Sequence, residues 1–542
     1  MRSFLAKFAA LVSGVLSGFD RLALVGRLRG ISYRRGLQNY LWANRVLFKD
    51  FAEHSAQVSA QLEEASLRLA REKGREIRYL NSAKERKEDI ARAIAARDHI
   101  KNGLICVLRS VDPCMSFHVR RNVKTRQLEV GYRPRKCMHL YHYQIHPIFG
   151  FMHARIQTWF PFRIHVCLNG REWLARQLDH ARLKYVRRKN TFTWLEDVAE
   201  AQALFNQQLQ AAWPTLLDEI ARALNPAHAD IFAKYPCHYY WCVDDSEWAS
   251  DIMFRSRTAL EQVYPRLLRH AVTSFSSLDV LRFLAQPLDA SGKVPHARRH
   301  EVHTNLKERL EGARLKHWLD GNSIKMYDKS SVLRCETMIQ DPEVFKVLRT
   351  VQGEPDGPVD WRPLRKGVVD LPRRGEVSQA ANERYLEALA AVHERTAVRD
   401  YVEPLCRPTT SVPTAVTATA ATPASVTPAA ASKGRRARAL NPFADDDAVL
   451  LAAAARHEFC INGLRNRDIR RLLYPVPTEQ VQEQRRRSAA VTRKLRLLCA
   501  HGLIERVPKT HRYLVTPIGR QKITAVLALR NTSIDDLIKT AA

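Results

Sequence analysis

The stretch EGARLKHWLDGNSIKMYDKSSVLRCETMI, residues 311–339, carries the clearest signal for the fold of this chain. Polar and apolar residues alternate on both sides of Asp320-Gly321, and an Asp-Gly pair between two alternating runs is typical of a two-residue β-hairpin turn. Pairing about that turn separates an apolar face, which His317 shares, from a basic and aromatic face. The apolar face holds Leu315, Leu319, Ile324 and Met326, and the other holds Arg314, Lys316, Trp318, Lys325 and Tyr327. The stretch therefore predicts part of an antiparallel sheet with one buried and one polar side.

A second β segment, residues 136–178, reads KCMHLYHYQIHPIFGFMHARIQTWFPFRIHVCLNGREWLARQL. If its two alternating runs pair through the Phe-Pro-Phe corner, side chains of two kinds separate onto opposite faces. One face holds His153, Arg155, Gln157, Trp159, Arg163, His165 and Cys167, and the other holds Met152, Ala154, Ile156, Ile164, Val166 and Leu168. This segment also predicts a sheet with one core face and one polar, basic face.

Helix-forming residues at helical spacing surround these strands and predict an α+β body. They occupy residues 44–70, 85–96, 172–224, 247–285 and 376–395. The N-terminal run MRSFLAKFAALVSGVLSGFDR has the hydropathy of a signal peptide, but Lys7 interrupts it, so we expect an amphipathic helix that packs on the body.

A Pro, Ala, Thr and Ser tract at 407–439 has too few large apolar groups to offset the entropy of ordering, so it predicts a disordered linker. We therefore expect a multidomain chain with four parts. These are a helical N-terminal region at 1–100, an α+β body with an antiparallel sheet at 101–405, the linker at 406–440 and a C-terminal domain at 441–542.

The charge of the chain favours a polyanionic partner. Its 87 Lys and Arg stand against 56 Asp and Glu, which gives a net charge of +31 and a pI near 10.0. Such a field concentrates nucleic acid, with anionic lipid or charge that only maintains solubility as alternatives. No apolar run reaches the ~18 residues needed to cross a bilayer, so no membrane partner is expected. Ten scattered cysteines without a C-x-x-C pair fit neither a disulfide framework nor a zinc ribbon, and they predict a cytoplasmic protein.

The C-terminal stretch RRRSAAVTRKLRLLCAHGLIERVPKTHRYLVTPIGRQK, residues 485–522, joins a basic helix, a His-Gly break and a short basic hairpin. Helices are predicted at 445–455, 465–474 and 488–500, and a last one begins near Pro517. This order of helix, helix, helix, hairpin and helix resembles the winged helix-turn-helix of MarR-type DNA-binding proteins over residues 445–530.

The resemblance implies that the third helix enters the major groove of DNA and that the hairpin, or wing, contacts the backbone or the minor groove. The corresponding positions are Arg487, Ser488, Thr492, Arg493 and Arg496 on the helix, and Lys509, His511 and Arg512 on the wing. Val491, Leu495 and Leu498 fall at helical spacing on the opposite stripe, which we expect to be buried. A winged helix used for protein contact is the alternative, and a homodimer is possible because proteins of this type often dimerise.

Tyr327 lies between Lys325 and Lys329, and a tyrosine flanked by cations can attack a phosphodiester because they lower its pKa and stabilise developing charge. The run NSIKMYDK followed by VLRCET resembles a stretch of about twenty residues in phage and plasmid replication initiators of the gene II and gene X type. That resemblance implies a nicking activity with Tyr327 as nucleophile and the two lysines as its electrostatic partners. His153, His165 and Glu336 are then the candidate ligands of a magnesium or manganese ion. Histidines that bind phosphate or satisfy buried backbone groups, and a tyrosine that only packs, are the alternatives.

The run CHYYWCVDDSEWASD, residues 237–251, predicts a helix N-terminus near Asp245, with carboxylates that hold two magnesium ions as the alternative. Through LSGFDRL, FMHARIQTWFPF, CLNGREWLARQ and NSIKMYDK, the chain resembles uncharacterised bacterial proteins that carry a C-terminal winged helix and are often linked with mobile elements. No activity follows from that resemblance. We expect a DNA-binding protein of a mobile element, with a metal-dependent nicking enzyme and a non-catalytic transcriptional regulator as alternatives.

Overall fold

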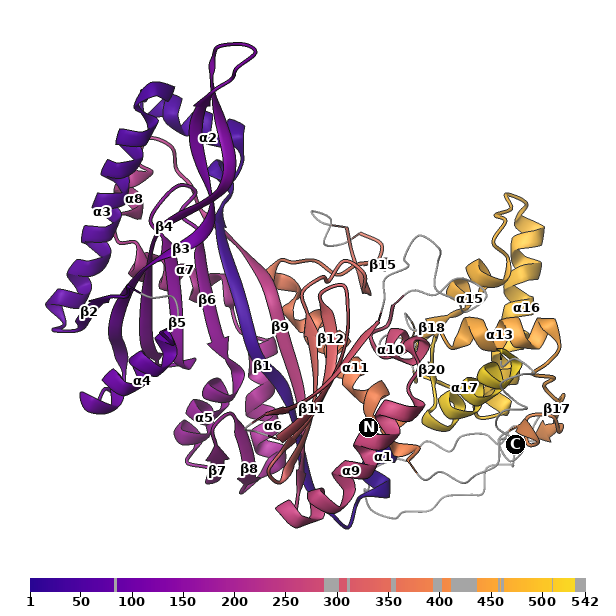
Figure 1. The fold of residues 1–542 in the computed structure, drawn as a ribbon. Coiled ribbons are helices and arrows are strands. Elements are labelled where there is room, and N and C mark those ends of the chain that lie inside the picture. Colours follow the sequence, from indigo (N-terminus) through magenta and orange to yellow (C-terminus); the bar gives the residue numbers. More distant parts are fainter. Residues whose placement is uncertain are drawn as a thin grey trace, which may run out of the picture.

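The structure is a computed structural model in which a large sheet with helices forms the body and a smaller, mostly helical module holds the C-terminal residues (Figure 1). It describes residues 1–81, 85–286, 302–309, 312–351, 357–392, 402–410, 436–456, 459, 463–508 and 510–531. Most of the predicted linker lies outside these residues. Its two described ends, β16 (Thr409–Thr410) and β17 (Arg436–Ala437), pair with each other in antiparallel fashion.

The body is built on one eleven-stranded sheet in the order β10-β11-β12-β13-β9-β1-β6-β5-β4-β3-β2. Every neighbouring pair is antiparallel except β2 and β3. The strands are β1 (Val12–Leu28), β2 (Glu76–Tyr79), β3 (Gly103–Arg121), β4 (Leu128–His146), β5 (Gly150–Gln157), β6 (Ile164–Asn169), β9 (Tyr239–Phe254), β10 (His303–Arg309), β11 (Gly312–Leu319), β12 (Asn322–Lys329) and β13 (Val332–Ile339). The predicted class, mixed α and β with an antiparallel sheet, is therefore confirmed.

The N-terminal run predicted as a helix is wrong beyond its first turns. Helix α1 covers only Arg2–Lys7, and β1 then runs through the centre of the sheet between β6 and β9. Residues 16–20 of this central strand are all buried, so the alternation typical of a half-buried strand is missing there and the run looks like a helix in the sequence. The predicted helical region 1–100 thus holds two strands together with α2 (Arg34–Ala43), α3 (Phe51–Glu72) and α4 (Lys87–Arg97).

The predicted helix start near Asp245 is also wrong, because residues 239–254 form β9 and helix α9 (Arg257–Ser274) begins only after its N-cap Ser256. Trp248, Ser250 and Ile252 face the core, while Glu247 and Asp251 point to the other side of the sheet and pair there with cations. The carboxylates that suggested a helix N-terminus are therefore distributed along a strand.

The predicted faces of the two β segments are confirmed. Leu315, Ile324 and Met326 are fully buried against α9 and α11 (Leu371–Ala390), and the apolar residues of β5 and β6 are buried in the main hydrophobic cluster of the body. Asp320 and Gly321 have φ angles of 48° and 80°, the left-handed conformation that a tight hairpin turn requires. His317 shares the buried face, where its Nδ1 lies 2.8 Å from the hydroxyl of Thr304.

The remaining elements of the body cover the sheet. The helices are α5 (Gly170–Ala181), α6 (Val198–Asn206), α7 (Trp213–Leu224), α8 (His228–Ile231) and α10 (Ser277–Phe283), with short 3-10 helices at Arg29–Ile31, Phe48–Asp50, Gln207–Leu209 and Val368–Asp370. Two small hairpins, β7 (Tyr185–Arg188) with β8 (Thr191–Leu195) and β14 (Lys346–Arg349) with β15 (Asp360–Pro363), flank it. Among the described residues, no helix is long and apolar enough to cross a membrane.

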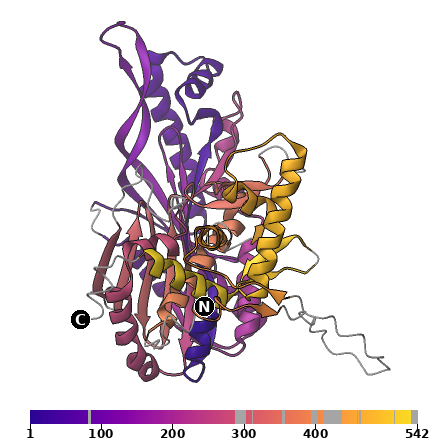
Figure 2. The ribbon, with the colours of Figure 1, turned by 90° about the vertical axis from the view of Figure 1, so that its right-hand side faces the viewer.

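The C-terminal module has its own core and a three-stranded sheet. Its elements are α13 (Asp445–Ala454), β18 (Leu464–Arg465), α15 (Asn466–Leu473), α16 (Val481–Ala500), β19 (Ile504–Arg506), β20 (Arg512–Val515) and α17 (Pro517–Asn531). The predicted buried stripe of α16 is confirmed, because Val491, Leu495 and Leu498 are at most 1% exposed. Helix α16 begins before the predicted start at Ser488, and Figures 1 and 2 show it extending beyond the rest of the module.

Candidate functional site

One side of the large sheet, which we call the polar face, carries charged and aromatic side chains across several strands. Strand register places Tyr327 opposite Arg314 on β11 and opposite Arg334 on β13, and it places Lys325 between Lys316 and Glu336. The polar face continues across β9, β1, β6 and β5. Its members there are Glu247, Asp245, Arg21, Cys167, His165, His153 and Arg155. Residues of both predicted β segments thus lie on the same side of one sheet, although β9 and β1 lie between the two segments.

Three carboxylates form a cluster on the polar face, which we call the carboxylate cluster. Oxygen atoms of Asp20, Glu247 and Glu336, from β1, β9 and β13, lie within 4.8 Å of one another. Asp20 is an extra residue in its strand, because the register with β9 shifts between Phe19 and Arg21. A bulge of this kind re-aims a side chain, and here it turns Asp20 toward the two glutamates. Three acidic side chains from distant parts of the chain therefore converge at one place.

Lys325 lies between two members of the cluster. Its Nζ donates to Glu247 Oε1 at 2.7 Å and to Glu336 Oε1 at 2.6 Å. Burial disfavours the charged lysine, but Glu336 and Glu247 raise its pKa above the ordinary value. Burial also raises the pKa of Glu336, and Lys325 offsets this only in part. The carboxylate cluster therefore binds a cation in this structure, and that cation is the ammonium group of Lys325.

A buried ion network supports the carboxylate cluster from below. Arg334 makes two bonds to Asp251, 2.6 and 2.8 Å long, and Arg171 makes a third at 2.9 Å. Arg334 Nη1 also lies 3.1 Å from Asp20 Oδ1. Burial would raise the pKa of Asp251, but Arg334 and Arg171 hold it below its ordinary value. The network fixes the backbones of β1, β9 and β13 and keeps Asp20 ionised.

Tyr327 is half-buried beside the cluster, with the Lys329 ammonium 5.2 Å from its ring centre. Burial raises the pKa of Tyr327, and Glu336 raises it further, although Lys325 acts in the opposite direction. The expectation that the pKa of Tyr327 is lowered overall is therefore wrong, because burial and Glu336 outweigh the lowering by Lys325. Burial also lowers the pKa of Lys329. Activation of the phenol would need a further cation.

The predicted metal set of His153, His165 and Glu336 does not come together. His153 on β5 and His165 on β6 are diagonal neighbours, but β1 and β9 lie between β6 and β13, the strand of Glu336. Three strand spacings therefore separate His165 from Glu336 by about 14 Å, and His153 is one strand further away. Burial lowers the pKa of His153 to about 4 and that of His165 to about 3, so both rings are neutral near pH 7. Asp20 and Glu247 take their place beside Glu336. The acidic run at 244–251 indicated Glu247 in the sequence, whereas nothing local indicated Asp20.

The outer part of the polar face is basic and aromatic. The ring of Trp318 stacks on His303 at 5.1 Å, and the Lys316 ammonium lies 5.4 Å from the centre of the Trp318 ring. Arg314, Lys316 and Trp318 are all half-buried, so each still presents atoms to solvent. Side chains of this kind in a row bind single-stranded nucleic acid through phosphate contacts and base stacking.

The predicted DNA-contacting residues of the C-terminal module fall into two groups. Arg493 and Arg496 are exposed and have no ion-pair partner within the described part of the chain, and His511 is also exposed. Arg487 instead donates to Glu483 at 2.9 Å. Ser488 and Thr492 bond to Asn466 of α15. Arg512 is half-buried in β20, and Lys509 lies outside the described residues.

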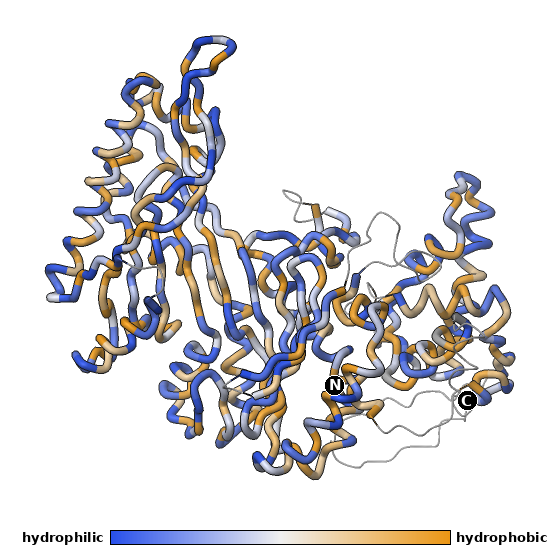
Figure 3. Tube along the Cα trace, in the orientation of Figure 1, coloured by the Kyte–Doolittle hydropathy of each residue, from blue (hydrophilic) through white to orange (hydrophobic). Residues whose placement is uncertain are grey.

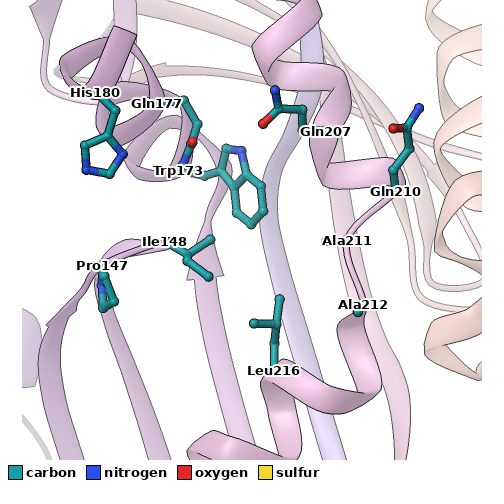
Figure 4. Close-up of a pocket in the computed structure, with 10 residues that line it drawn as sticks. All are labelled: Pro147, Ile148, Trp173, Gln177, His180, Gln207, Gln210, Ala211, Ala212 and Leu216. Atoms are coloured by element: carbon teal, nitrogen blue, oxygen red, sulfur yellow. The ribbon is translucent and has the colours of Figure 1, made fainter.

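A surface pocket of about 450 Å³ lies elsewhere, between α5, α7 and the turn that joins β4 to β5 (Figure 4). Its lining residues are Pro147, Ile148, Trp173, Gln177, His180, Gln207, Gln210, Ala211, Ala212 and Leu216. None of them belongs to the carboxylate cluster or to the predicted site, so the pocket gives no support to a small-molecule ligand for that site.

A scan against protein-family models, a search of curated proteins and a search of solved structures each found no match. Function is therefore inferred from the residues of the chain and their geometry alone.

Proposed function

We propose that this protein binds DNA through two surfaces, the exposed side of α16 and the basic part of the polar face. The observation that carries the proposal is the pair Arg493 and Arg496, two exposed cations without partners in the described chain, on the side of α16 opposite its buried stripe. Helix α16 holds six Lys and Arg against one Glu. A basic helix that keeps two exposed arginines free of ion pairs is suited to phosphate and base contact.

The order of elements supports a winged-helix interpretation of the C-terminal module. Helices α13, α15 and α16 are followed by the β19–β20 hairpin and then by α17, and α15 packs against α16. In this interpretation α16 is the recognition helix and the hairpin is the wing. At 20 residues, α16 is about 30 Å long, so its outer part reaches beyond the module. Figure 3 shows that this outer end is hydrophilic, as a DNA-facing helix requires.

The bonds made by Ser488 and Thr492 refine this proposal. Because their hydroxyl groups face Asn466 of α15, they position α16 against its neighbour, and the exposed arginines supply the DNA contacts. Association with a mobile element is part of the proposal and depends on the sequence resemblance alone.

Titration of labelled duplex DNA with the full chain at several salt concentrations tests DNA binding. We expect an affinity that falls steeply with salt, because each phosphate contact releases a counterion. A protein that gives no signal change with duplex or single-stranded DNA at low salt would refute the proposal.

A second candidate function is metal-dependent cleavage of a DNA strand, and the carboxylate cluster beside Tyr327 is the observation that favours it. Oxygen donors from Asp20, Glu247 and Glu336 match the preference of magnesium and manganese for hard ligands. An ion held by all three carboxylates would compete with Lys325 for Glu247 and Glu336, and its charge would offset the burial that raises the pKa of Tyr327. The basic, aromatic strands β11 and β12 lead a DNA strand to this point.

In that reaction, the Tyr327 phenol oxygen forms a bond to phosphorus and the bond from phosphorus to one sugar oxygen breaks. The phenol proton ends on the released sugar hydroxyl, and the DNA remains joined to the enzyme through a phosphotyrosine. Arg314 and Lys316, across the strand pairs from Tyr327 and Lys325, are placed to bind the phosphates on either side.

Incubation of labelled single-stranded DNA with the protein and magnesium or manganese tests this activity. We expect a covalent adduct that Tyr327→Phe abolishes and that Tyr79→Phe, at an exposed tyrosine of the edge strand β2, leaves unchanged. Cleavage by Tyr327→Phe equal to that of the parent chain would rule out the assigned nucleophile, whereas absence of cleavage with both metals would rule out the activity.

A further inference from the structure

Two cysteines and a histidine meet at the far end of the polar face, where the long β3–β4 hairpin leaves the sheet. Sulfur and nitrogen atoms of Cys114, Cys137 and His139 lie within 4.8 Å of one another. Strand β4 pairs with β5 only from His139 onward, so residues 115–136 form an arm with which no other strand of the described residues pairs. The first part of the arm still contacts the body, because Phe117 donates to the carbonyl oxygen of Phe160. The three side chains therefore sit at the base of the arm, which projects from the sheet in Figure 1.

The chemistry of the three groups is that of a metal site. The thiol sulfur atoms of Cys114 and Cys137 are 2.8 Å apart, and both cysteines are half-buried, so solvent ions can reach them. His139 Nδ1 lies 3.1 Å from the carbonyl oxygen of Cys137. When Nδ1 donates to a carbonyl, the proton is fixed there and Nε2 keeps its lone pair, which is the usual arrangement of a metal-binding histidine.

The surroundings of the two cysteines are positively charged, because Arg135 lies opposite Cys114 across the strand pair and the rest of the arm is basic. Two thiolates and one divalent ion form a neutral unit, so the positive arm does not have to accept a net charge. Binding releases the thiol protons to solvent.

The positions of the cysteines favour a shared metal over a disulfide bond. Cys114 is opposite Arg135 and Cys137 is opposite Asp112, so the two cysteines are diagonal neighbours across the strand pair. Diagonal neighbours are about 7–8 Å apart, beyond the ~6.8 Å limit of Cα separations that a disulfide spans. A tetrahedral zinc ion with bonds of about 2.3 Å holds its sulfur ligands about 3.8 Å apart, so binding would move the two sulfur atoms apart by about 1 Å from their separation of 2.8 Å.

We propose that Cys114, Cys137 and His139 bind one zinc ion, with a fourth position left to water, and that this site fixes the base of the β3–β4 arm. The arm carries seven Lys and Arg against one Glu between residues 115 and 136, and Figure 3 shows its tip as hydrophilic. A fixed base holds these charges at a constant angle to the polar face. The site is independent of the carboxylate cluster, which offers oxygen donors only.

Cobalt titration of the full chain tests the site. The protein is purified under reducing conditions without a histidine tag, treated with chelator and titrated with Co²⁺, whose bonds to thiolates give a charge-transfer absorption that oxygen and nitrogen ligands do not. We expect one equivalent of Co²⁺ to produce this absorption and one equivalent of Zn²⁺ to remove it. Cys114→Ser and Cys137→Ser should lose the signal, while Cys167→Ser and Cys242→Ser, at half-buried cysteines of the same sheet, should keep it.

A second measurement does not depend on the folding of any variant. Zinc should protect Cys114 and Cys137 of the unaltered chain from alkylation, as read by mass spectrometry, and should leave the labelling of Cys406, an exposed cysteine, unchanged. Absence of the charge-transfer absorption, an unchanged absorption in Cys114→Ser, or a Cys114–Cys137 disulfide in the reduced preparation would each overturn the proposal.

Discussion

Removing both Arg493 and Arg496 should weaken DNA binding and make it less dependent on salt. Both side chains are exposed, and within the described chain neither has an ion-pair partner that its loss would leave unpaired. Each phosphate contact contributes about 0.9 to the slope of log affinity against log salt concentration, so the double alanine variant should lose about 1.8 from that slope. Between 50 and 200 mM salt, its affinity should therefore fall about 12-fold less than that of the parent chain.

Fluorescence anisotropy with a labelled duplex at four or more salt concentrations gives both slopes directly. The matched control is the double variant Arg92→Ala with Arg257→Ala, which removes the same two charges from exposed arginines of α4 and α9 in the body. The control should keep the slope of the parent chain, because a change in net charge alone moves few bound counterions. Equal slopes for the α16 variant and the parent chain would refute the assignment of α16 as a DNA contact.

Three further predictions concern stability. Asp251→Asn removes the carboxylate that bonds to both Arg334 and Arg171 and leaves Asp20 as the other carboxylate near them. It should lower the free energy of unfolding of the body by about 3–5 kcal/mol in urea titrations, and a loss below 1 kcal/mol would show that the network is dispensable. Leu495→Ala, at a side chain 1% exposed, should cost the C-terminal module about 2–5 kcal/mol, whereas a neutral effect would contradict the packing of α16. Burial lowers the pKa of His142 to about 4 from an ordinary 6.5. As the pH drops from 7 toward 4, this histidine takes up a proton in the unfolded chain before it does so in the folded chain, and the free energy of unfolding therefore falls. The loss should be about 2 kcal/mol by pH 5, and His142→Gln should show a correspondingly flatter pH dependence of the urea midpoint.

The sequence predicted those parts of the fold that depend on local chemistry. Asp320-Gly321 fixed a hairpin because a tight turn needs two residues that accept positive φ, and alternation then set both faces of β11 and β12. The buried stripe of α16 followed from helical spacing in the same way. In both cases the signal and the structure lie within one short stretch.

Features that depend on distant pairing were missed. The run at residues 1–21 predicts a helix, but its second half forms the start of β1, which becomes a strand only between β6 and β9 from other parts of the chain. Asp20 joins Glu336 through a bulge and two strand registers, none of which leaves a local pattern. His153 and His165 were grouped with Glu336 by residue type alone, although two strands separate them from it.

The cysteines show the same limit. No short spacing motif links Cys114 to Cys137, and the register of the long β3–β4 hairpin brings them together. A sequence search for C-x-x-C pairs therefore excludes zinc ribbons without excluding a site built across a strand pair.

The most direct test of the central claim is to map where DNA lies on the full chain by photo-crosslinking and mass spectrometry. We expect crosslinks to duplex DNA to concentrate in α16, close to Arg493 and Arg496, and crosslinks to single strands to concentrate in β11 and β12. Crosslinks spread evenly over the basic surface, or absent from α16, would contradict the account.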